Sequence, residues 1–172
     1  MSERITSNSN PQLFLMQYSP KFLVTDLIFV PKFFFTPSII EKRKPLSANA
    51  RRAGWVGCNI LYQKIPVQGK IDIIRDGVEI STADVLKNYA QTKKLQTKNI
   101  NLRGWLLDVL NCINKIDGEL FKLKDIYEFA DYLKSIHGDN NNVKAKIRQQ
   151  LQFLRDKGFV EFVGRGVYRK VV

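Results

Sequence analysis

The stretch KAKIRQQLQFLRDKGFVEFVGRGVYRK, residues 144–170, decides the fold class of this chain. Apolar residues recur at helical spacing over 143–154, and the preceding DNNN at 139–142 supplies side chains that commonly cap helices. The segments FVEFV and VYRKV, joined by Gly-Arg-Gly at 164–166, predict a two-stranded hairpin. The stretch therefore predicts one helix, a tight turn and a basic β-ribbon.

Two further helical patterns precede this stretch. Apolar spacing predicts one helix over 102–116, ended by Gly118, and a second over 123–136, ended by Gly138. Three helices followed by a basic hairpin is the order of the winged helix, a relative of the helix–turn–helix. We therefore predict a winged-helix domain over residues 100–172.

The outward face of the last predicted helix offers side chains suited to a DNA groove. If its apolar stripe faces the core, the helical step of about 100° per residue fixes which positions face outward. Amide side chains can pair with adenine in the major groove, a small Ala allows close approach, and Lys or Arg meet phosphates. The predicted base-facing residues are Asn142, Ala145, Gln149 and Gln152, and the predicted phosphate-facing residues are Lys144, Lys146, Arg148 and Arg155.

The predicted hairpin adds positive charge beside that helix. Residues 142–172 contain eight Lys or Arg against two acidic residues, a net charge of +6. An Arg between two Gly can press close to a DNA backbone or minor groove, so we predict that Arg165 contacts double-stranded DNA. We predict the same contact for Arg169 on the following strand of the hairpin. The alternative is that this polar, basic surface is only solvated.

The composition of the whole chain limits the classes of function. The 172 residues carry 28 Lys or Arg and 16 Asp or Glu, a net charge of +12, which favours a polyanionic partner. No apolar run long enough for a membrane span and no signal-peptide core occurs, so we expect a cytoplasmic protein without membrane contact. Cys58, Cys112 and the single His137 lack metal-ligand spacing, so we predict no metal site.

Composition changes character at KKLQTKNIN, residues 93–101, where we place the boundary between a domain over 1–99 and the winged helix. Before it, LFLMQY (13–18) and FLVTDLIFV (22–30) predict a hairpin whose strands are buried on both faces. The predicted class is thus α+β, a sheet domain followed by the winged helix.

The rest of the first half is basic and less regular. We expect an irregular segment with one short helix over 36–60, a hairpin over 70–80 and a helix over 81–94.

The two tryptophans of the chain have different sequence contexts. Trp105 lies at helical spacing with apolar neighbours, which predicts a core position, whereas Trp55 in ARRAGWVGCN is either a core residue or an aromatic that meets a ligand.

Three blocks of the sequence resemble the Dpn I-type methyl-directed type II restriction endonucleases. They are EKRKPLSANARRAGWVGCNI, RGWLLDVLNCINKI and the C-terminal stretch quoted above, and the resemblance covers about residues 10–172. It implies a PD-(D/E)xK nuclease domain followed by a winged helix, both recognising GATC that carries N6-methyladenine. It also implies Mg²⁺-supported hydrolysis of both strands, and that Arg51, Arg52 and Trp55 face the methylated site, with Trp55 sensing the methyl groups.

The family's catalytic Asp, its ExK pair and its four zinc cysteines lie upstream of the stretch that this chain resembles. We therefore expect an N-terminally truncated member with no catalytic residue and no Mg²⁺ or Zn²⁺ of its own, a monomer that does not cleave by itself. Whether a separate N-terminal fragment supplies the missing residues is left open. The alternative function is a winged-helix transcription regulator or methyl-DNA reader that never cuts.

One partial match to the nuclease motif is present. Asp26 is followed by Glu41, Lys42 and Arg43, but Arg43 takes the place of the required Lys and Pro45 follows closely, so we expect a basic loop there.

Overall fold

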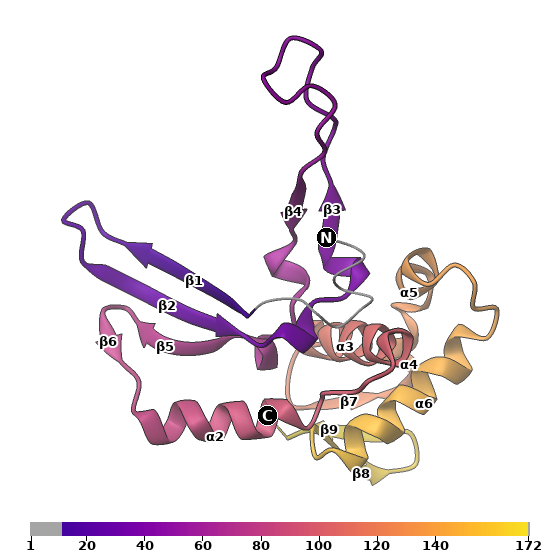
Figure 1. Cartoon of the computed structure of the whole chain (residues 1–172). Helices are drawn as coiled ribbons and strands as arrows, with labels where there is room; N and C mark the ends of the chain where they lie inside the picture. Colours follow the sequence, from indigo (N-terminus) through magenta and orange to yellow (C-terminus); the bar gives the residue numbers. More distant parts are fainter. Residues whose placement is uncertain (1–11, 172) are drawn as a thin grey trace.

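A four-stranded antiparallel sheet organises the first half of the chain in the computed structural model, which describes residues 12–171 (Figure 1). The strands occur in the order β1-β2-β5-β6 and comprise β1 (Leu13–Tyr18), β2 (Val24–Val30), β5 (Ile71–Arg75) and β6 (Val78–Glu79). Both predicted hairpins are therefore confirmed. At the second one, Asp76 and Gly77 adopt the left-handed φ of 51° and 77° that a two-residue hairpin turn needs.

The expectation that both faces of the first hairpin are buried is wrong, because β2 has a single buried residue, Val30, and β1 has none. The β1 side chains Phe14, Met16 and Tyr18 are each more than half exposed. The reason is positional, because β1 is an edge strand that pairs with β2 alone. A run of apolar residues alone does not distinguish such an edge from a buried strand.

Helix α2 (Thr82–Lys93) follows the sheet and begins as the sequence predicts. The Ser81 hydroxyl oxygen accepts a hydrogen bond of 3.1 Å from the backbone N–H of Asp84, which satisfies one of the free donors of the first turn.

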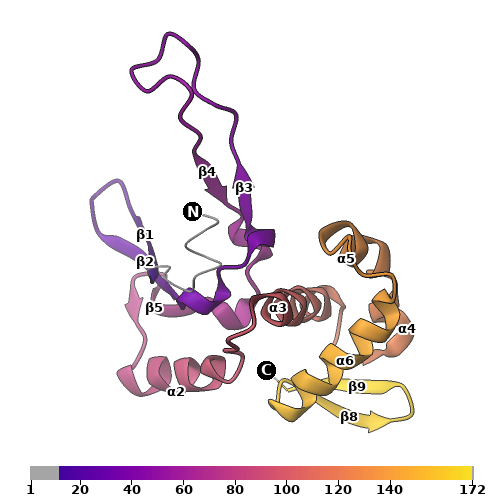
Figure 2. The same ribbon diagram turned by 45° about the vertical axis from the view of Figure 1, so that its right-hand side comes forward.

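An arm projects from this first half (Figures 1 and 2). It consists of β3 (Ile40–Lys42), β4 (Cys58–Ile60) and the loop 43–57 between them. Four 3₁₀ turns lie in the segments that flank β3 and β4: η1 (Lys32–Phe34), η2 (Pro37–Ile39), η3 (Tyr62–Lys64) and η4 (Val67–Gly69). The sequence predicted an irregular segment with one short helix over 36–60, where the described structure has only the 3₁₀ turn η2. The strand pair was missed, because strands of three residues show no periodicity.

The second half has the winged-helix order. Its elements are α3 (Ile100–Lys115), β7 (Leu120–Lys122), α4 (Leu123–Tyr127), α5 (Ala130–Ile136), α6 (Val143–Asp156), β8 (Val160–Gly164) and β9 (Val167–Lys170). The three strands form a sheet in the order β7-β9-β8. The predicted fold class, a sheet unit followed by a winged helix, is confirmed.

Three details of this half differ from the prediction. The expected single helix over 123–136 is two helices, because Phe129 leaves helical geometry with φ −86° and ψ 6° while the apolar spacing continues across the break. Strand β7 was missed, since its partner β9 lies far away in the sequence. The Asn142 side chain does not cap α6, and Asn140 instead accepts a 2.8 Å bond from the Asn142 backbone N–H.

The buried apolar side chains of both halves form one continuous cluster. Phe34 and Ile65 belong to it from the first half, and Trp105, Leu110 and Leu151 from the second. Trp105 is only 6% exposed, which confirms its predicted core position. Polar contacts cross the same junction, because the side-chain amides of Gln68 and Asn114 bond each other at 3.2 and 2.9 Å.

Candidate nucleic-acid interface

Helix α6 turns the amide side chains of Gln149 and Gln152 to solvent, as its periodicity predicts. Ile147, Leu151 and Leu154 are completely buried, and this anchors one face of α6 against the core. The opposite face carries exposed side chains and is free to meet a partner in the described structure. The exposed residues among those predicted to bind DNA are Asn142, Lys144, Ala145, Arg148, Gln149, Gln152 and Arg155, whereas Lys146 is half-buried.

Gln150 is a polar side chain that the sequence did not single out. It is completely buried in α6, its Oε1 has no hydrogen-bond partner, and its Nε2 lies 3.5 Å from Oε1 of Gln149. Its position in the helix, next to Gln149, did not predict this burial, which depends on the residues that pack around it.

The wing consists of β8, β9 and the turn at residues 165–166 between them. Gly166 takes a left-handed φ of 69°, a backbone conformation that residues with a side chain rarely adopt. Its carbonyl accepts a 2.8 Å bond from the backbone N–H of Leu123, so the tip of the wing is tied to the start of α4. Arg165 stands exposed at this tip, beside the helix–turn–helix.

Two of the predicted DNA-binding arginines are paired with acids in the structure. Arg155 donates to the neighbouring Asp156 at 2.8 and 3.0 Å, and Arg169 donates to Glu161 at 2.9 Å. These pairs are about half exposed, and pairs of this kind contribute little stability. A phosphate can therefore replace the carboxylate at small cost.

Aromatic side chains brace the surface between the wing and α6. Tyr168 of β9 stacks on Phe121 with ring centroids 5.4 Å apart and meets the edge of Phe162 at 5.7 Å. Burial, and next the nearby Tyr127, raise the pKa of Tyr168, while the charges of Arg155 and Arg148 act in the opposite direction. Two tyrosines and two arginines thus converge where α4, α6 and the wing meet.

The arm presents an exposed aromatic residue among cations. Trp55 is 54% exposed, which rules out the core position that its sequence context had left open. Its ring lies over Gly57, where an added Cβ would come within 2.9 Å of the indole Cζ3. Arg51 and Arg52 are exposed beside it, and the Trp55 backbone N–H donates to the Arg52 carbonyl at 3.0 Å.

The structure does not bring the arm and the wing together. Figures 1 and 2 differ by a turn about the vertical axis, and in both the arm stands at the top and the wing lies at the bottom. The predicted DNA-binding residues therefore form two groups. Arg51, Arg52 and Trp55 lie on the arm, and the others lie on α6 and the wing.

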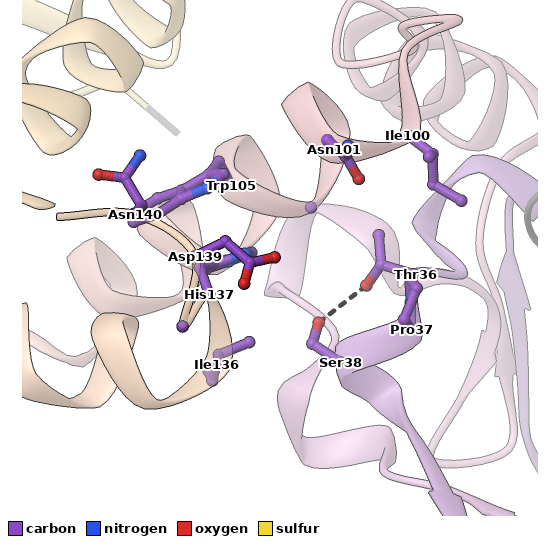
Figure 3. A pocket seen from close by; sticks show the side chains of 12 residues that line it. Thr36, Pro37, Ser38, Ile100, Asn101, Trp105, Ile136, His137, Asp139 and Asn140 are labelled. Atoms are coloured by element: carbon purple, nitrogen blue, oxygen red, sulfur yellow. Dashed lines mark hydrogen bonds between the residues drawn. The ribbon is translucent and has the colours of Figure 1, made fainter. Parts of the chain in front are cut away.

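A cleft of about 510 Å³ lies at the junction of the two halves, between η2, α3 and the loop after α5 (Figure 3). Asp108 beneath it accepts from the Ser38 hydroxyl at 3.1 Å and bonds His137 Nε2 at 2.9 Å, while His137 stacks on Trp105 at 4.1 Å. In a hydrolytic triad the histidine stands between serine and acid. Here the acid is in the middle, so this group joins the halves rather than activating a nucleophile.

The partial nuclease motif is not assembled in the described structure. Asp26 lies in β2 and Glu41 in β3, which belong to different sheets, and the Glu41 carboxylate accepts a 3.0 Å bond from Asn59. The expectation of a loop around Glu41 is wrong, because β3 pairs with β4 there. Within residues 12–171 no three His, Cys, Asp or Glu side chains are grouped to hold a metal ion. The described residues therefore do not fit the Mg²⁺ or zinc of the resembled family.

The two cysteines support the same conclusion about zinc. Cys58 is half-buried in β4 of the arm and Cys112 is fully buried in α3, and neither forms a disulfide. Burial raises the pKa of the Cys112 thiol to about 12, which keeps it protonated and unsuited to metal binding.

The outward amide face of α6, the basic wing and the order of the elements define a winged-helix DNA-binding protein. Residues 1–98 match the family model DpnI, described as the Dam-replacing family, and residues 101–170 match DpnI_C, the Dam-replacing HTH domain. The chain belongs to the Dam-replacing family and is a DNA-binding protein of restriction type. No helix among the described residues is long and apolar enough to cross a membrane.

Proposed function

We propose that this chain recognises duplex DNA at GATC sites that carry N6-methyladenine, with α6 in the major groove. The observation that carries this proposal is the exposed position of Ala145 one helical turn from the exposed Gln149. N6-methylation leaves adenine one N–H and adds a methyl group in the major groove. The Gln149 carbonyl can accept from that N–H while the methyl group packs against Ala145.

The wing and the flanking cations add the contacts that do not depend on sequence. Arg165, Lys144 and Arg148 meet phosphates, which fixes the register of α6 on the duplex and makes the affinity dependent on salt. An open hollow of about 440 Å³ lies between α5 and the first turns of α6, with Lys134, Lys144 and Arg148 in its wall. Asp131 lies there too, so the hollow is not uniformly positive.

The arm supplies a second site of contact in this proposal. Trp55, with Arg51 and Arg52 beside it, meets the methylated site and senses its methyl groups. Exposing a large indole to water is unfavourable, and stacking on a base or filling a groove recovers that cost. Because arm and wing lie apart, the proposal gives one chain two separate surfaces for DNA.

Within methyl-directed restriction, this chain supplies recognition as a cytoplasmic monomer. Cleavage of both strands with Mg²⁺ belongs, in this proposal, to carboxylates outside the described residues, whether on a separate nuclease fragment or elsewhere. The environments of Asp26 and Glu41 support this division, because the two carboxylates lie in different sheets.

The proposal is tested by competition between duplexes of equal length and charge. The labelled probe contains one methylated GATC, and the competitors contain either that site or the same bases, methylated, in scrambled order. We expect the GATC competitor to displace the full chain at a concentration at least about tenfold lower. Equal displacement would leave only a nonspecific basic clamp, and specificity for another sequence would favour a transcription regulator.

A further inference from the structure

One tyrosine contacts two of the cations on α6. Tyr127 is the last residue of α4, and its hydroxyl oxygen accepts a 2.7 Å hydrogen bond from Nη1 of Arg148. The Nζ atom of Lys144 lies 5.4 Å from the centroid of its ring. Residues four apart share one face of a helix, so a single phenol holds both side chains on the side of α6 that faces α4.

We propose that Tyr127 is a phosphate-binding and positioning residue, which forms with Arg148 and Lys144 a site for one phosphodiester of duplex DNA. This inference rests on the function proposed above and adds a residue from outside α6 and the wing. Its chemistry follows from the hydroxyl group. The oxygen accepts from Arg148, so the hydroxyl proton is available to a phosphate oxygen, which tyrosine commonly contacts in such interfaces.

The cations keep enough donors for the same phosphate. Arg148 uses one of its five N–H groups on Tyr127, and the others can reach phosphate oxygens. Lys144 adds a compact charge from the preceding turn of α6. Arginine and lysine lose rotamer freedom when they bind, and contacts already made to a half-buried ring reduce that loss.

The alternative explanation of the contact between Tyr127 and Arg148 is that it only stabilises the fold. Tyr127 packs against the hydrophobic core through its ring, and this part of its role needs no ligand. Replacement by Phe keeps the ring and removes only the hydroxyl group. The two explanations therefore separate in Tyr127→Phe, because a structural bond changes the unfolding midpoint and a phosphate contact changes the affinity for DNA.

The experiment measures the affinity of the full chain for a duplex with one methylated GATC, by fluorescence anisotropy at fixed salt. We expect Tyr127→Phe to bind roughly five- to tenfold more weakly. The factor should be the same for methylated and unmethylated duplexes, because a phosphate carries no sequence information. Tyr132→Phe is the matched control, since Tyr132 is also half-buried and Lys115 lies over its ring at 5.2 Å. It should bind like the unchanged protein.

A double-mutant cycle tests the coupling to Arg148. In the Arg148→Ala background, Tyr127→Phe should weaken binding by a smaller factor than it does with Arg148 present, because the hydroxyl then keeps only its own bond to the phosphate and no longer positions the guanidinium. Additive losses, or Tyr127→Phe binding as tightly as the unchanged protein, would overturn the inference and leave the proposed function standing. If the unchanged protein does not bind duplex DNA, the proposed function fails first. A melting midpoint that moves while affinity stays constant would assign Tyr127 a structural role alone.

Discussion

Gln149 and Ala145 are the residues on which the proposed specificity depends. Both are exposed on the same side of α6, and the buried positions Ile147 and Leu151 on the other side of the helix fix their direction. Helical periodicity was sufficient to predict this, because the core contacts of α6 repeat every three to four residues.

Gln149→Ala should therefore weaken binding to the methylated GATC duplex by about 1–3 kcal/mol and reduce discrimination between sequences. Arg165→Ala should instead weaken all duplexes alike and lower the salt dependence by about one unit, because it removes a phosphate contact. Titrations at several salt concentrations measure both quantities. The matched control is Gln96→Ala, an exposed Gln in the link before α3. Loss of affinity for every sequence in Gln149→Ala would contradict a base contact.

The contact between Tyr127 and Arg148 could not be predicted from the sequence. The sequence predicted a phosphate contact for Arg148 but gave no role to Tyr127, since 21 positions separate them in the chain. The buried Gln150 was missed for a related reason. Its burial depends on the neighbours of α6 and not on any pattern within the helix.

The sequence predicted the elements that show a repeated apolar pattern or a clear turn signal, and it missed the short elements that show neither. Helices α3 and α6, the first two hairpins and the wing follow from apolar spacing and turn residues. Strand β7 and the pair β3–β4 have three residues each and depend on partners distant in the chain. The break between α4 and α5 was hidden because apolar residues continue across it.

The arm is the element whose role is most open to test. Trp55 is exposed, so Trp55→Ala should change the free energy of unfolding by no more than about 0.5 kcal/mol. It should nevertheless weaken binding to methylated GATC by about 1–3 kcal/mol, the usual effect of removing an aromatic stack on a base. Leu46→Ala is the control, since Leu46 is also an exposed apolar residue of the arm, and its N–H donates to the Trp55 carbonyl. Unchanged affinity in Trp55→Ala would remove the arm from the proposed interface.

For the whole molecule, the domain boundary between residues 99 and 100 stays a prediction from the sequence. In the structure the two halves share one hydrophobic core. Asp108 joins them, since it is only 4% exposed and bonds both Ser38 and His137. Composition alone could suggest a boundary but not this junction.

Asp108→Ala should lower the free energy of unfolding by about 3 kcal/mol, because it leaves two polar side chains near the core without their acceptor. Both halves should lose stability together in one transition, which urea titration by circular dichroism and by tryptophan fluorescence can establish. Asp139→Ala serves as the control, since Asp139 lines the same cleft but is exposed. Two separate transitions, with only the second half destabilised, would show that the halves are energetically independent.

The central claim is that this chain distinguishes methylated from unmethylated GATC. Its most direct test is the ratio of dissociation constants of the full chain for two duplexes that differ only in the N6-methyl groups, at one fixed salt concentration. The account predicts that the methylated duplex binds at least about tenfold more tightly, a difference of about 1.4 kcal/mol. A ratio of one, maintained from low to physiological salt, would contradict it.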